Sequence, residues 1–419
     1  MGNNLKKNRI SIIANSLIAL YGERGFSSST EYGMSGGSRI FIECAKRWLD
    51  EGISIAVFTP DVGEKFCKDN GLNRANYVTW ASSRFGTLGR FGTLGVIALY
   101  IIGLAKGCLI TLGESQQLNK TIVYSSSDFW PDSIPGFIAK LRNRNSKWIA
   151  GFYLFVNNPF SGDSAYKGSR KLKGLIYCLS QRPTYWLIRK YADMVWVTNE
   201  LDRWKFIDGR RLTADKVIAI KGGVDAKTPL LVSEPMEKRF DAIFIGRLVP
   251  EKGVLELIDI WKYVCEKKKD AKLAILGSGP LNSQVQNKIK QSGLAGNIKA
   301  FGFIDGLEKF KIIKESKIVV HPSIMDSGGM AACEAMICGL PGVSFDLQSL
   351  KVYYPKGMLK SPCYNSKTFA NNILKLLYDE SLYHNLSKEA MDFAKDWDWD
   401  KVAKETLNKV KKVCLINTD

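Results

Sequence analysis

The sequence predicts an α/β protein with two doubly wound domains that face each other across a cleft. The chain has 419 residues, which is too long for a single hydrophobic core. Short apolar runs typical of buried parallel strands alternate with helical patterns in both halves. A segment with two prolines and no periodicity, Ala226–Lys238, is predicted to be the linker. We therefore expect a first domain at residues 1–225, a linker at 226–239, a second domain at 240–395 and a C-terminal tail at 396–419.

The composition, with 45% apolar and 24% charged residues, indicates a soluble globular protein. The nine cysteines form no C-x-x-C pair and the chain has only two histidines. We therefore expect reduced thiols in the cytoplasm rather than disulfides or a metal site. Lys6, Lys7 and Arg9 precede an apolar run that no cleavage site follows, so we expect no secretory signal.

The formal net charge of +19 falls mostly on the first half of the chain. Through Asp225 there are 31 Lys and Arg against 18 Asp and Glu, and after it 29 against 23. The excess includes two basic runs, Ala139–Lys147 and Lys167–Lys173. Such a surface favours anionic partners, such as a lipid bilayer, a pyrophosphate-linked lipid or nucleic acid. Solubility alone also explains it.

The first half opens with a strand–loop–helix–strand pattern. Arg9–Leu20 is predicted to be a buried strand, and a glycine-containing loop, Tyr32–Ser38, leads into a helix at Arg39–Asp50. Gly36 and Gly37 let the backbone approach a phosphate at the helix start. The unit lacks a strict G-x-G-x-x-G motif, so by itself it is not specific.

An internal repeat, RFGTLG-RFGTLG, occupies Arg84–Gly95 and precedes an apolar run that Lys106 interrupts. The interruption argues against a membrane-spanning helix, which needs about 20 uninterrupted apolar residues. Two interpretations stay open. Either the run is a crossover helix buried on one side, or the repeat docks at a lipid surface, with Arg84 and Arg90 at the headgroups.

Polar residues follow the predicted strands of the first half. A strand at 121–125 is followed by Asp128 and Asp132, and Tyr153 and Asn157 lie at the end of the next strand. Ligands of open α/β sheets bind at the carboxyl ends of strands, so we expect these residues at the mouth of the cleft. Asp128 is a candidate base or binder of an acceptor hydroxyl. The alternative, which we prefer, is that Asp128 caps the following helix.

The second half begins with a strand, Phe240–Ile245, that runs into Gly246, Arg247 and, five residues on, Lys252. An Arg and a Lys on a loop before a helix can hold a diphosphate from two sides. After Asp225 the chain contains 27 Lys but only two Arg, so Arg247 is predicted to serve planar, bidentate binding. A solvated surface pair is the alternative.

The stretch His321–Gly342 follows a predicted strand at 317–320 and carries the strongest site signal. Asp326 and Glu334 flank a turn with two glycines and the start of a helix. Free backbone N–H groups at a helix start attract an anion, and carboxylates beside it favour a ligand with both phosphate and hydroxyl groups. An ordinary turn with surface acids is the alternative.

Together these motifs resemble the family 4 retaining glycosyltransferases of the GT-B type, also described as glycosyl transferases group 1. Asp326 and Glu334 have the spacing of the two acidic residues in that family's signature. The other matching positions are Pro322, Ser323, Gly329, Ala335, Met336, Gly339 and Pro341, with Gly246-Arg247-Leu248, Glu251-Lys252-Gly253, Ser278-Gly279-Pro280 and Gly223-Val224-Asp225 elsewhere. The resemblance covers nearly the whole chain and is strongest over residues 240–342.

The chain departs from the family pattern in four places. The first acid is Asp rather than Glu, Ser327-Gly328 replaces a Gly-aromatic pair, and Gly222 replaces an Asn. Many relatives also carry a His in the first half near the reacting sugar, and this chain has none there. The contribution of that His would here come from Asp128, Tyr153 or the backbone, or be absent.

The resemblance implies a GT-B fold of two Rossmann-like domains, a tail that crosses back onto the first domain, and retaining transfer from a nucleotide-diphosphate sugar with no cofactor or metal. Glu334 would bind the ribose hydroxyls and Asp326 a hydroxyl of the transferred sugar, while Arg247 and Lys252 stabilise the leaving diphosphate. The residues expected to bind the donor are Gly36, Gly37, Gly246, Arg247, Lys252, Gly277, Phe303, Ile304, Ser327, Gly328, Gly329, Met330, Ala331 and Glu334.

The expected partners are a nucleotide sugar and a glycan or lipid-linked acceptor, in the synthesis of a cell-surface polysaccharide or glycoconjugate. The expected location is the cytoplasm, with a peripheral position on the inner face of the membrane left open. One rival is an enzyme of the same fold with other chemistry, such as a nucleotide-sugar epimerase or a glucan synthase. Another is a basic nucleic-acid-binding protein. Trp186, Trp196 and Trp204 lie among basic residues, but their spacing is typical of core residues, which argues against this rival.

Overall fold

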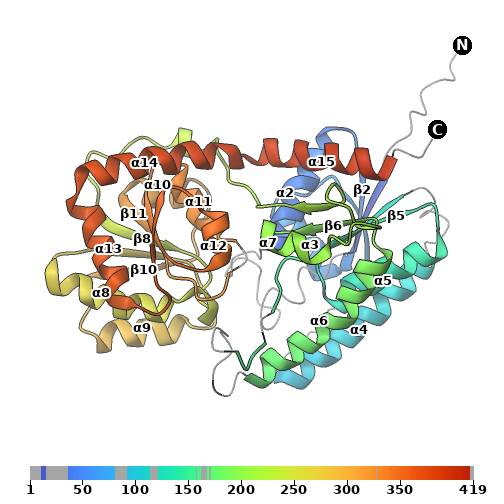
Figure 1. The fold of residues 1–419 in the computed structure, drawn as a ribbon, viewed down its shortest axis with the longest axis horizontal. Coiled ribbons are helices and arrows are strands. Elements are labelled where there is room, and N and C mark those ends of the chain that lie inside the picture. Colours follow the sequence, from blue (N-terminus) through green and yellow to red (C-terminus); the bar gives the residue numbers. More distant parts are fainter. Residues whose placement is uncertain are drawn as a thin grey trace, which may run out of the picture.

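The computed structural model describes residues 11–15, 36–80, 92–113, 121–156, 158–161, 168, 171–326 and 328–415. Figure 1 shows two α/β domains beside each other, with a long helix running along the top from one to the other. Each domain contains one sheet in which all strands are parallel. The predicted fold class is therefore confirmed.

The first sheet has seven strands in the order β3-β2-β1-β4-β5-β6-β7. They are β1 (Ser11–Asn15), β2 (Ser54–Pro60), β3 (Asn76–Trp80), β4 (Ile122–Ser125), β5 (Lys147–Gly151), β6 (Met194–Val197) and β7 (Val217–Ala219). The strand order reverses where β1 pairs with β4. In such sheets ligands bind at this point, outside the carboxyl ends of the two strands.

The helices of the first domain are α2 (Gly36–Asp50), α3 (Asp61–Asp69), α4 (Gly92–Gly113), α5 (Trp130–Arg142), α6 (Lys171–Tyr191) and α7 (Glu200–Phe206). α2 begins earlier than the sequence predicts. α2 includes Gly36 and Gly37 in its first turn, whereas a loop was expected up to Ser38. α5 and α6 contain Pro135 and Pro183, and both helices continue through these residues.

The apolar run after the repeat forms α4 as one continuous helix that Lys106 does not interrupt. α4 packs on α5 through small residues that recur every four positions: Gly103, Gly107 and Thr111 are buried. A Cβ at Gly107 would lie 3.0 Å from the Pro135 ring, so glycine allows the two helices to approach closely. Residues 81–91, which hold most of the repeat, lie outside the described residues, and the lipid-docking interpretation of the repeat stays a prediction.

Among the helices formed by the described residues, we find none whose length and apolar character would carry it across a membrane.

The second sheet has six strands in the order β10-β9-β8-β11-β12-β13. They are β8 (Phe240–Ile245), β9 (Leu273–Leu276), β10 (Ile298–Gly302), β11 (Ser316–His321), β12 (Gly342–Phe345) and β13 (Met358–Ser361). This order repeats that of the first sheet, with the reversal between β8 and β11. The longer helices are α8 (Val254–Lys267), α9 (Asn282–Gln291), α10 (Gly306–Lys314), α13 (Ser366–Tyr378) and α14 (Glu380–Ala394). The shorter ones are α11 (Met330–Met336), α12 (Gln348–Tyr353) and the 3-10 turns η3 (Thr228–Leu231), η4 (Pro250–Lys252) and η5 (Lys395–Trp397).

The last helix, α15 (Trp399–Leu415), returns to the first domain and packs against α2. Its buried side chains, which include Trp399, Leu407 and Val410, join the apolar core formed by α2 and the first sheet. The indole N–H of Trp48 in α2 donates to the backbone oxygen of Ala403 at 2.9 Å. The tail is thus part of the first domain's core.

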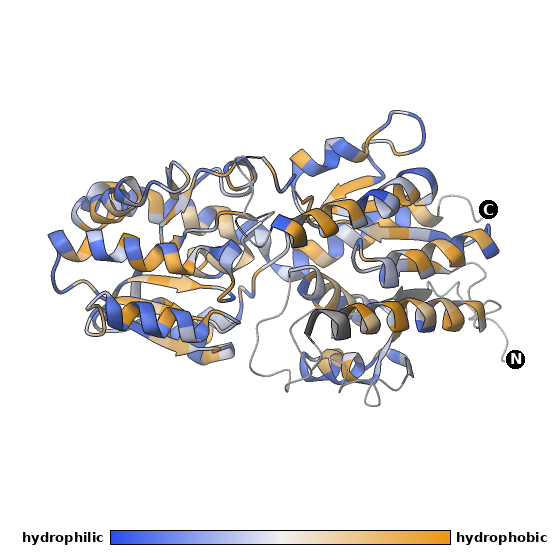
Figure 2. Cartoon of the chain, turned by 90° about the horizontal axis from the view of Figure 1, so that it is seen from below, coloured by the Kyte–Doolittle hydropathy of each residue, from blue (hydrophilic) through white to orange (hydrophobic). Residues whose placement is uncertain are grey.

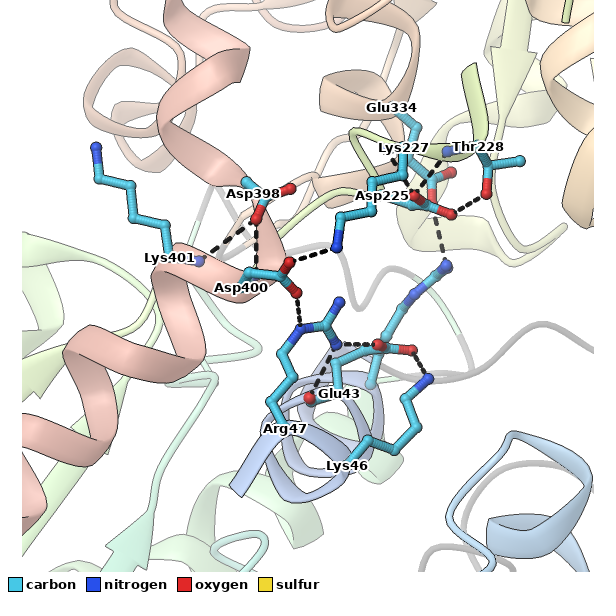
Figure 3. A network of polar contacts seen from close by, with 11 residues as sticks. Glu43, Lys46, Arg47, Asp225, Lys227, Thr228, Glu334, Asp398, Asp400 and Lys401 are labelled. Atoms are coloured by element: carbon cyan, nitrogen blue, oxygen red, sulfur yellow. Dashed lines mark hydrogen bonds and ion pairs between the residues drawn. The ribbon is translucent and has the colours of Figure 1, made fainter. Parts of the chain in front are cut away.

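Two segments of chain pass between the domains side by side. The first is the stretch that leads into the linker, and the second is the turn between α14 and α15. Val224 N donates to Trp397 O at 2.8 Å, and Trp399 N donates to Val224 O at 3.3 Å. A polar network surrounds this crossing: Asp400 accepts from Arg47 of α2 and from Lys227 of the linker (Figure 3).

The three tryptophans that we placed at core spacing do not share one environment. Trp196 is fully buried, whereas Trp186 and Trp204 are exposed. The expectation was wrong for these two because each lies on the exposed side of its helix, α6 or α7, and residue type alone does not show which side of a helix faces the core.

We expect α15 to contribute to the stability of the first domain. Leu407→Ala removes a buried side chain from the shared core, so it should lower the free energy of unfolding by about 2–4 kcal/mol. Lys409→Ala, on the exposed side of the same helix, should change it by less than about 0.5 kcal/mol. Urea unfolding of both variants measures the difference, and equal values would show that α15 does not stabilise the domain.

Candidate active site

The predicted site residues gather where the strand order of each sheet reverses. Arg247 follows β8 and Asp326 follows β11 in the second domain, while Asp128 follows β4 in the first. α2, which carries Gly36, is the helix after β1. The carboxyl ends of the four central strands therefore supply the site from both domains.

A cavity of about 540 Å³, which we call the first cavity, lies between the two domains. The second domain contributes most of its walls, and α2 closes it from the other side. The expected donor-binding residues that line it are Gly246, Arg247, Gly277, Phe303, Ile304, Ala331 and Glu334. Its volume lies within the range of about 300–1,000 Å³ that is typical of small-molecule sites.

Glycine is required at the floor of this cavity. Gly277 has a φ of +143°, and a Cβ there would lie 1.8 Å from the backbone oxygen of Gly246. The carboxyl ends of β8 and β9 can therefore approach closely only when position 277 has no side chain.

The Glu334 carboxylate, on α11, is bound by cations from both domains. Lys309 of α10 lies 3.1 Å and Arg39 of α2 lies 3.2 Å from the same oxygen, Oε1. Lys309 also bonds Asp305 at 2.6 Å, so the buried ammonium is shared between two acids. The Arg39 contact links the two domains directly at the wall of the first cavity.

A second cavity of about 470 Å³ lies beside the first. The expected residues that line it are Gly36, Gly37, Asp128, Arg247, Lys252, Asp326, Gly328 and Met330. Arg247 lines both cavities, which makes it the side chain that connects them. Asp326 and Glu334, the two acids of one sequence motif, thus line different cavities.

Asp326 forms a buried polar cluster with Lys252 and His321. Its Oδ2 lies 2.6 Å from Lys252 Nζ and 3.0 Å from His321 Nε2. Burial alone would raise the pKa of Asp326, but the Lys252 charge and the His321 hydrogen bond hold it well below its ordinary value. Burial lowers the pKa of His321, against the opposing effect of Asp326. The carboxylate therefore stays ionised at neutral pH.

Backbone contacts fix the loop that carries Lys252. Ile324 N and Met325 N donate to Glu251 O at 3.0 and 3.3 Å, which ties this loop to the one before Asp326. Gly253 has a φ of +66°, and a Cβ there would lie 1.9 Å from Pro322 O. The Glu-Lys-Gly motif thus holds Lys252 against Asp326.

Asp128 does not cap α5, so the role that we preferred for it was wrong. The N-cap residue is Phe129, and Asp132 inside the first turn accepts from the Ser126 and Ser127 hydroxyls instead. Asp128 turns into the protein, where its Oδ2 accepts from Gln181 of α6 at 2.8 Å. Burial raises the pKa of Asp128 to about 6, with a smaller opposing effect of the Gln181 hydrogen bond.

Tyr153 lies opposite Gly37 in the second cavity. A Cβ at Gly37 would lie 2.7 Å from its ring, so the glycine admits the tyrosine. The Tyr153 hydroxyl hydrogen-bonds that of Tyr124 at 2.6 Å, and burial raises the pKa of Tyr153. Both candidates for the role of the missing first-domain His, Asp128 and Tyr153, therefore line this cavity.

The helix predicted after the glycine turn is present as α11. α11 begins at Met330 and has only seven residues, so the helix is short and its dipole correspondingly small. The Gly329 carbonyl accepts from the Tyr354 hydroxyl. Ser327 and Asn157 lie outside the described residues, so their expected positions stay predictions.

Three basic residues of the site were missed: Arg39, Lys309 and His321. His321 ends β11 five residues before Asp326, and its position after a buried strand was a usable signal. Arg39 and Lys309 lie on helices that reach Glu334 only through the tertiary fold. Nothing in their local sequence distinguishes them from solvated basic residues.

Comparison with known proteins identifies the second domain. The family model for glycosyl transferases group 1 matches residues 232–393. An uncharacterized glycosyltransferase of Methanocaldococcus jannaschii is 29% identical over 314 residues, which cover 64% of this chain and 72% of that protein. Residues 232–393 are therefore a group 1 glycosyltransferase domain. A second glycosyltransferase of that organism is 31% identical over 176 residues, which cover 40% of this chain and 44% of that protein.

Solved structures resemble this chain in fold. Anabaena HepE in complex with UDP and glucose aligns with a TM-score of 0.68 at 16% identity, covering 96% of this chain and 99% of that one. Staphylococcus aureus TarM aligns with a TM-score of 0.66 at 14% identity, covering 97% and 99%. At these identities the likeness concerns the GT-B fold alone.

Asp128 should make the stability of the enzyme depend on pH. Its pKa rises from an ordinary 3.8 to about 6 in the folded protein, so between these values the folded state keeps a proton that the unfolded chain has lost. Stability therefore falls as pH rises through this interval, by up to about 3 kcal/mol. Asp128→Asn should remove this loss. The free energy of unfolding of the variant should therefore rise relative to that of the parent between about pH 4 and about pH 7.

Urea unfolding of parent and variant at these two pH values measures the effect. Asp50→Asn, at an exposed carboxylate of α2, is the matched control. A parent-to-variant difference that is the same at both pH values would contradict the buried, proton-retaining state of Asp128.

Proposed function

We propose that this enzyme is a retaining glycosyltransferase that moves a sugar from a nucleotide-diphosphate sugar to a glycan or lipid-linked acceptor, in the synthesis of a cell-surface polysaccharide or glycoconjugate. The observation that carries the proposal is the position of Arg247. It lines the cavity that holds Glu334 and also the one that holds Lys252 and Asp326. A diphosphate that joins a nucleoside in the first cavity to a sugar in the second would pass this guanidinium.

The nucleoside fits the first cavity by its chemistry. Backbone and apolar groups around Phe303 and Ile304 suit a planar base, and Glu334 suits ribose hydroxyls. The ribose must share or replace the contacts that Glu334 makes with Arg39 and Lys309. Because Arg39 belongs to the first domain, donor binding would alter a contact between the domains.

The reacting sugar fits the second cavity. Asp326 stays ionised and can accept a hydrogen bond from a sugar hydroxyl, while Lys252 can interact with the adjoining phosphate. As the glycosidic bond to the phosphate breaks, negative charge grows on the leaving diphosphate. Arg247 and Lys252 would stabilise that charge in place, so that no metal ion is needed.

Two routes exist for the acceptor proton. In the front-face route, which retention suggests, the leaving phosphate takes the proton from the acceptor hydroxyl. Asp128 is the alternative, since it lines the same cavity and its pKa of about 6 leaves it largely ionised at neutral pH. A retaining route through a covalent intermediate would require a carboxylate nucleophile on the reacting face.

The names of relatives support a sugar nucleotide and a polymer acceptor. HepE has been solved with UDP-glucose. A poly(glycerol-phosphate) alpha-glucosyltransferase of Bacillus subtilis is 23% identical over 225 residues, which cover 51% of this chain and 33% of that protein. UDP-sugars are therefore the first donors to test. A nucleotide-release assay across UDP-, GDP- and ADP-sugars, with and without chelator, separates the nucleotides and tests the proposed independence from metal.

Arg247→Ala should lower kcat/KM for transfer by about 100-fold or more, because it removes a cation from the leaving group. Glu334→Gln should raise the donor KM more than it lowers kcat, because it weakens ribose binding. Arg239→Ala replaces the other arginine of the second half, which is largely exposed, and should leave activity unchanged. Near-parent turnover of purified, folded Arg247→Ala would refute the assignment of this site.

A further inference from the structure

The outer side of α4 carries an apolar stripe exposed to solvent. Its members are Ile97, Ile101, Ala105, Leu109 and Leu112, at intervals of three or four residues along one side of the helix. Ile101 is 59% exposed and Leu109 is 62% exposed. The small residues of the opposite side already pack on α5, so this stripe is a second apolar face, and no element among the described residues covers it.

α6 carries a matching stripe. Leu172, Ile176, Leu179 and Trp186 are exposed at the same spacing, with Ile176 at 60% and Trp186 at 56%. Its buried side holds Gln181, Thr184 and Ile188. A solvated helix of a soluble domain normally has charged residues on its outer side, so two such helices in one domain call for a covering partner.

The two helices are connected through α5. α5 packs against both, and one residue of α5 joins them: Trp130 N donates to the Tyr100 hydroxyl of α4 at 2.9 Å, and Trp130 Nε1 donates to Ser180 O of α6 at 2.8 Å. In Figure 1 both helices lie on the lower side, away from α15. Figure 2 looks from below and shows hydrophobic residues along this part of the domain. We call the two stripes together the α4–α6 surface.

The charge of this surface has one sign. The sequences of α4 and α6 contain no Asp or Glu, whereas exposed Lys106, Arg182, Arg189 and Lys190 lie next to the apolar stripes. Lys190 Nζ lies 4.8 Å from the Trp186 ring centre. Apolar side chains beside Lys and Arg, with a Trp among them, are the composition of helices that lie in the interface of an anionic bilayer.

We propose that the α4–α6 surface docks this enzyme on the surface of an anionic lipid bilayer. The apolar stripes enter the region between headgroups and acyl chains, and the basic residues bind the headgroups. A second copy of the chain is the weaker candidate, because the basic residues of two such faces would repel each other. The surface is distinct from the Arg84–Gly95 repeat, although that repeat leads directly into α4.

The docked orientation would bring the second cavity close to the lipid. Tyr177 of α6 lines that cavity and stacks on Phe129 with ring centres 5.5 Å apart, while its neighbour Ile176 belongs to the α4–α6 surface. The same helix thus borders both the bilayer and the site. This step rests on the proposed function: a lipid-linked acceptor would then reach the reacting sugar without leaving the membrane.

Co-flotation with vesicles tests the surface directly. The full chain should bind vesicles of equal parts phosphatidylglycerol and phosphatidylcholine, and binding should weaken in high salt and on pure phosphatidylcholine. The variant Ile101→Ser/Leu109→Ser/Ile176→Ser/Leu179→Ser should bind at least about tenfold more weakly, because it removes the apolar contacts. The variant Arg182→Gln/Arg189→Gln/Lys190→Gln should lose the preference for anionic vesicles.

The matched control is Leu230→Ser/Leu231→Ser/Met236→Ser, which replaces highly exposed apolar residues of the linker and should bind like the parent. Absence of binding by the parent, or equal binding by the Ile101 variant, would overturn the proposal. So would a parent dimer in sedimentation that this variant dissociates, because a second copy would then cover the surface. Vesicle binding requires no turnover, so its failure leaves the proposed transferase activity standing.

Discussion

The packing of α15 onto the first domain is the constraint on which the arrangement of the site depends. The chain completes the second sheet and then places Trp399, Leu407 and Val410 in the core of the first domain. Apolar burial of this kind costs several kcal/mol to undo, so the ends of the two sheets are kept within reach of each other. The two cavities exist because of this return, since each is lined by residues of both domains.

Within that arrangement, each acid of the site is paired with basic side chains. Lys252 and His321 hold Asp326, while Lys309 and Arg39 hold Glu334. Each carboxylate is buried and remains tolerable only because it is paired. Within the described residues, Arg247 has no ion-pair partner, which leaves its guanidinium available to an anion that enters between the cavities.

Sequence patterns predicted the parts that depend on local chemistry. Buried strands appear as apolar runs, and β8 matches its predicted bounds residue for residue. The motif residues Arg247, Lys252 and Asp326 come together because the loops that carry them follow β8 and β11, which are paired strands of the same sheet. The site residues that the sequence did not reveal have a different origin. Arg39 reaches Glu334, and Gln181 reaches Asp128, through contacts between elements distant in sequence, and no local pattern encodes such contacts.

The paired crossing at Val224 and Trp397 has a consequence for motion between the domains. A single flexible tether would let one domain swivel in any direction relative to the other. Two segments that run together and are bonded to each other resist twisting and sliding, and they bend readily only about an axis across the pair. The crossing therefore acts as a hinge with one preferred axis. The two domains can open and close about this axis while residues that face each other across the cavities stay in register.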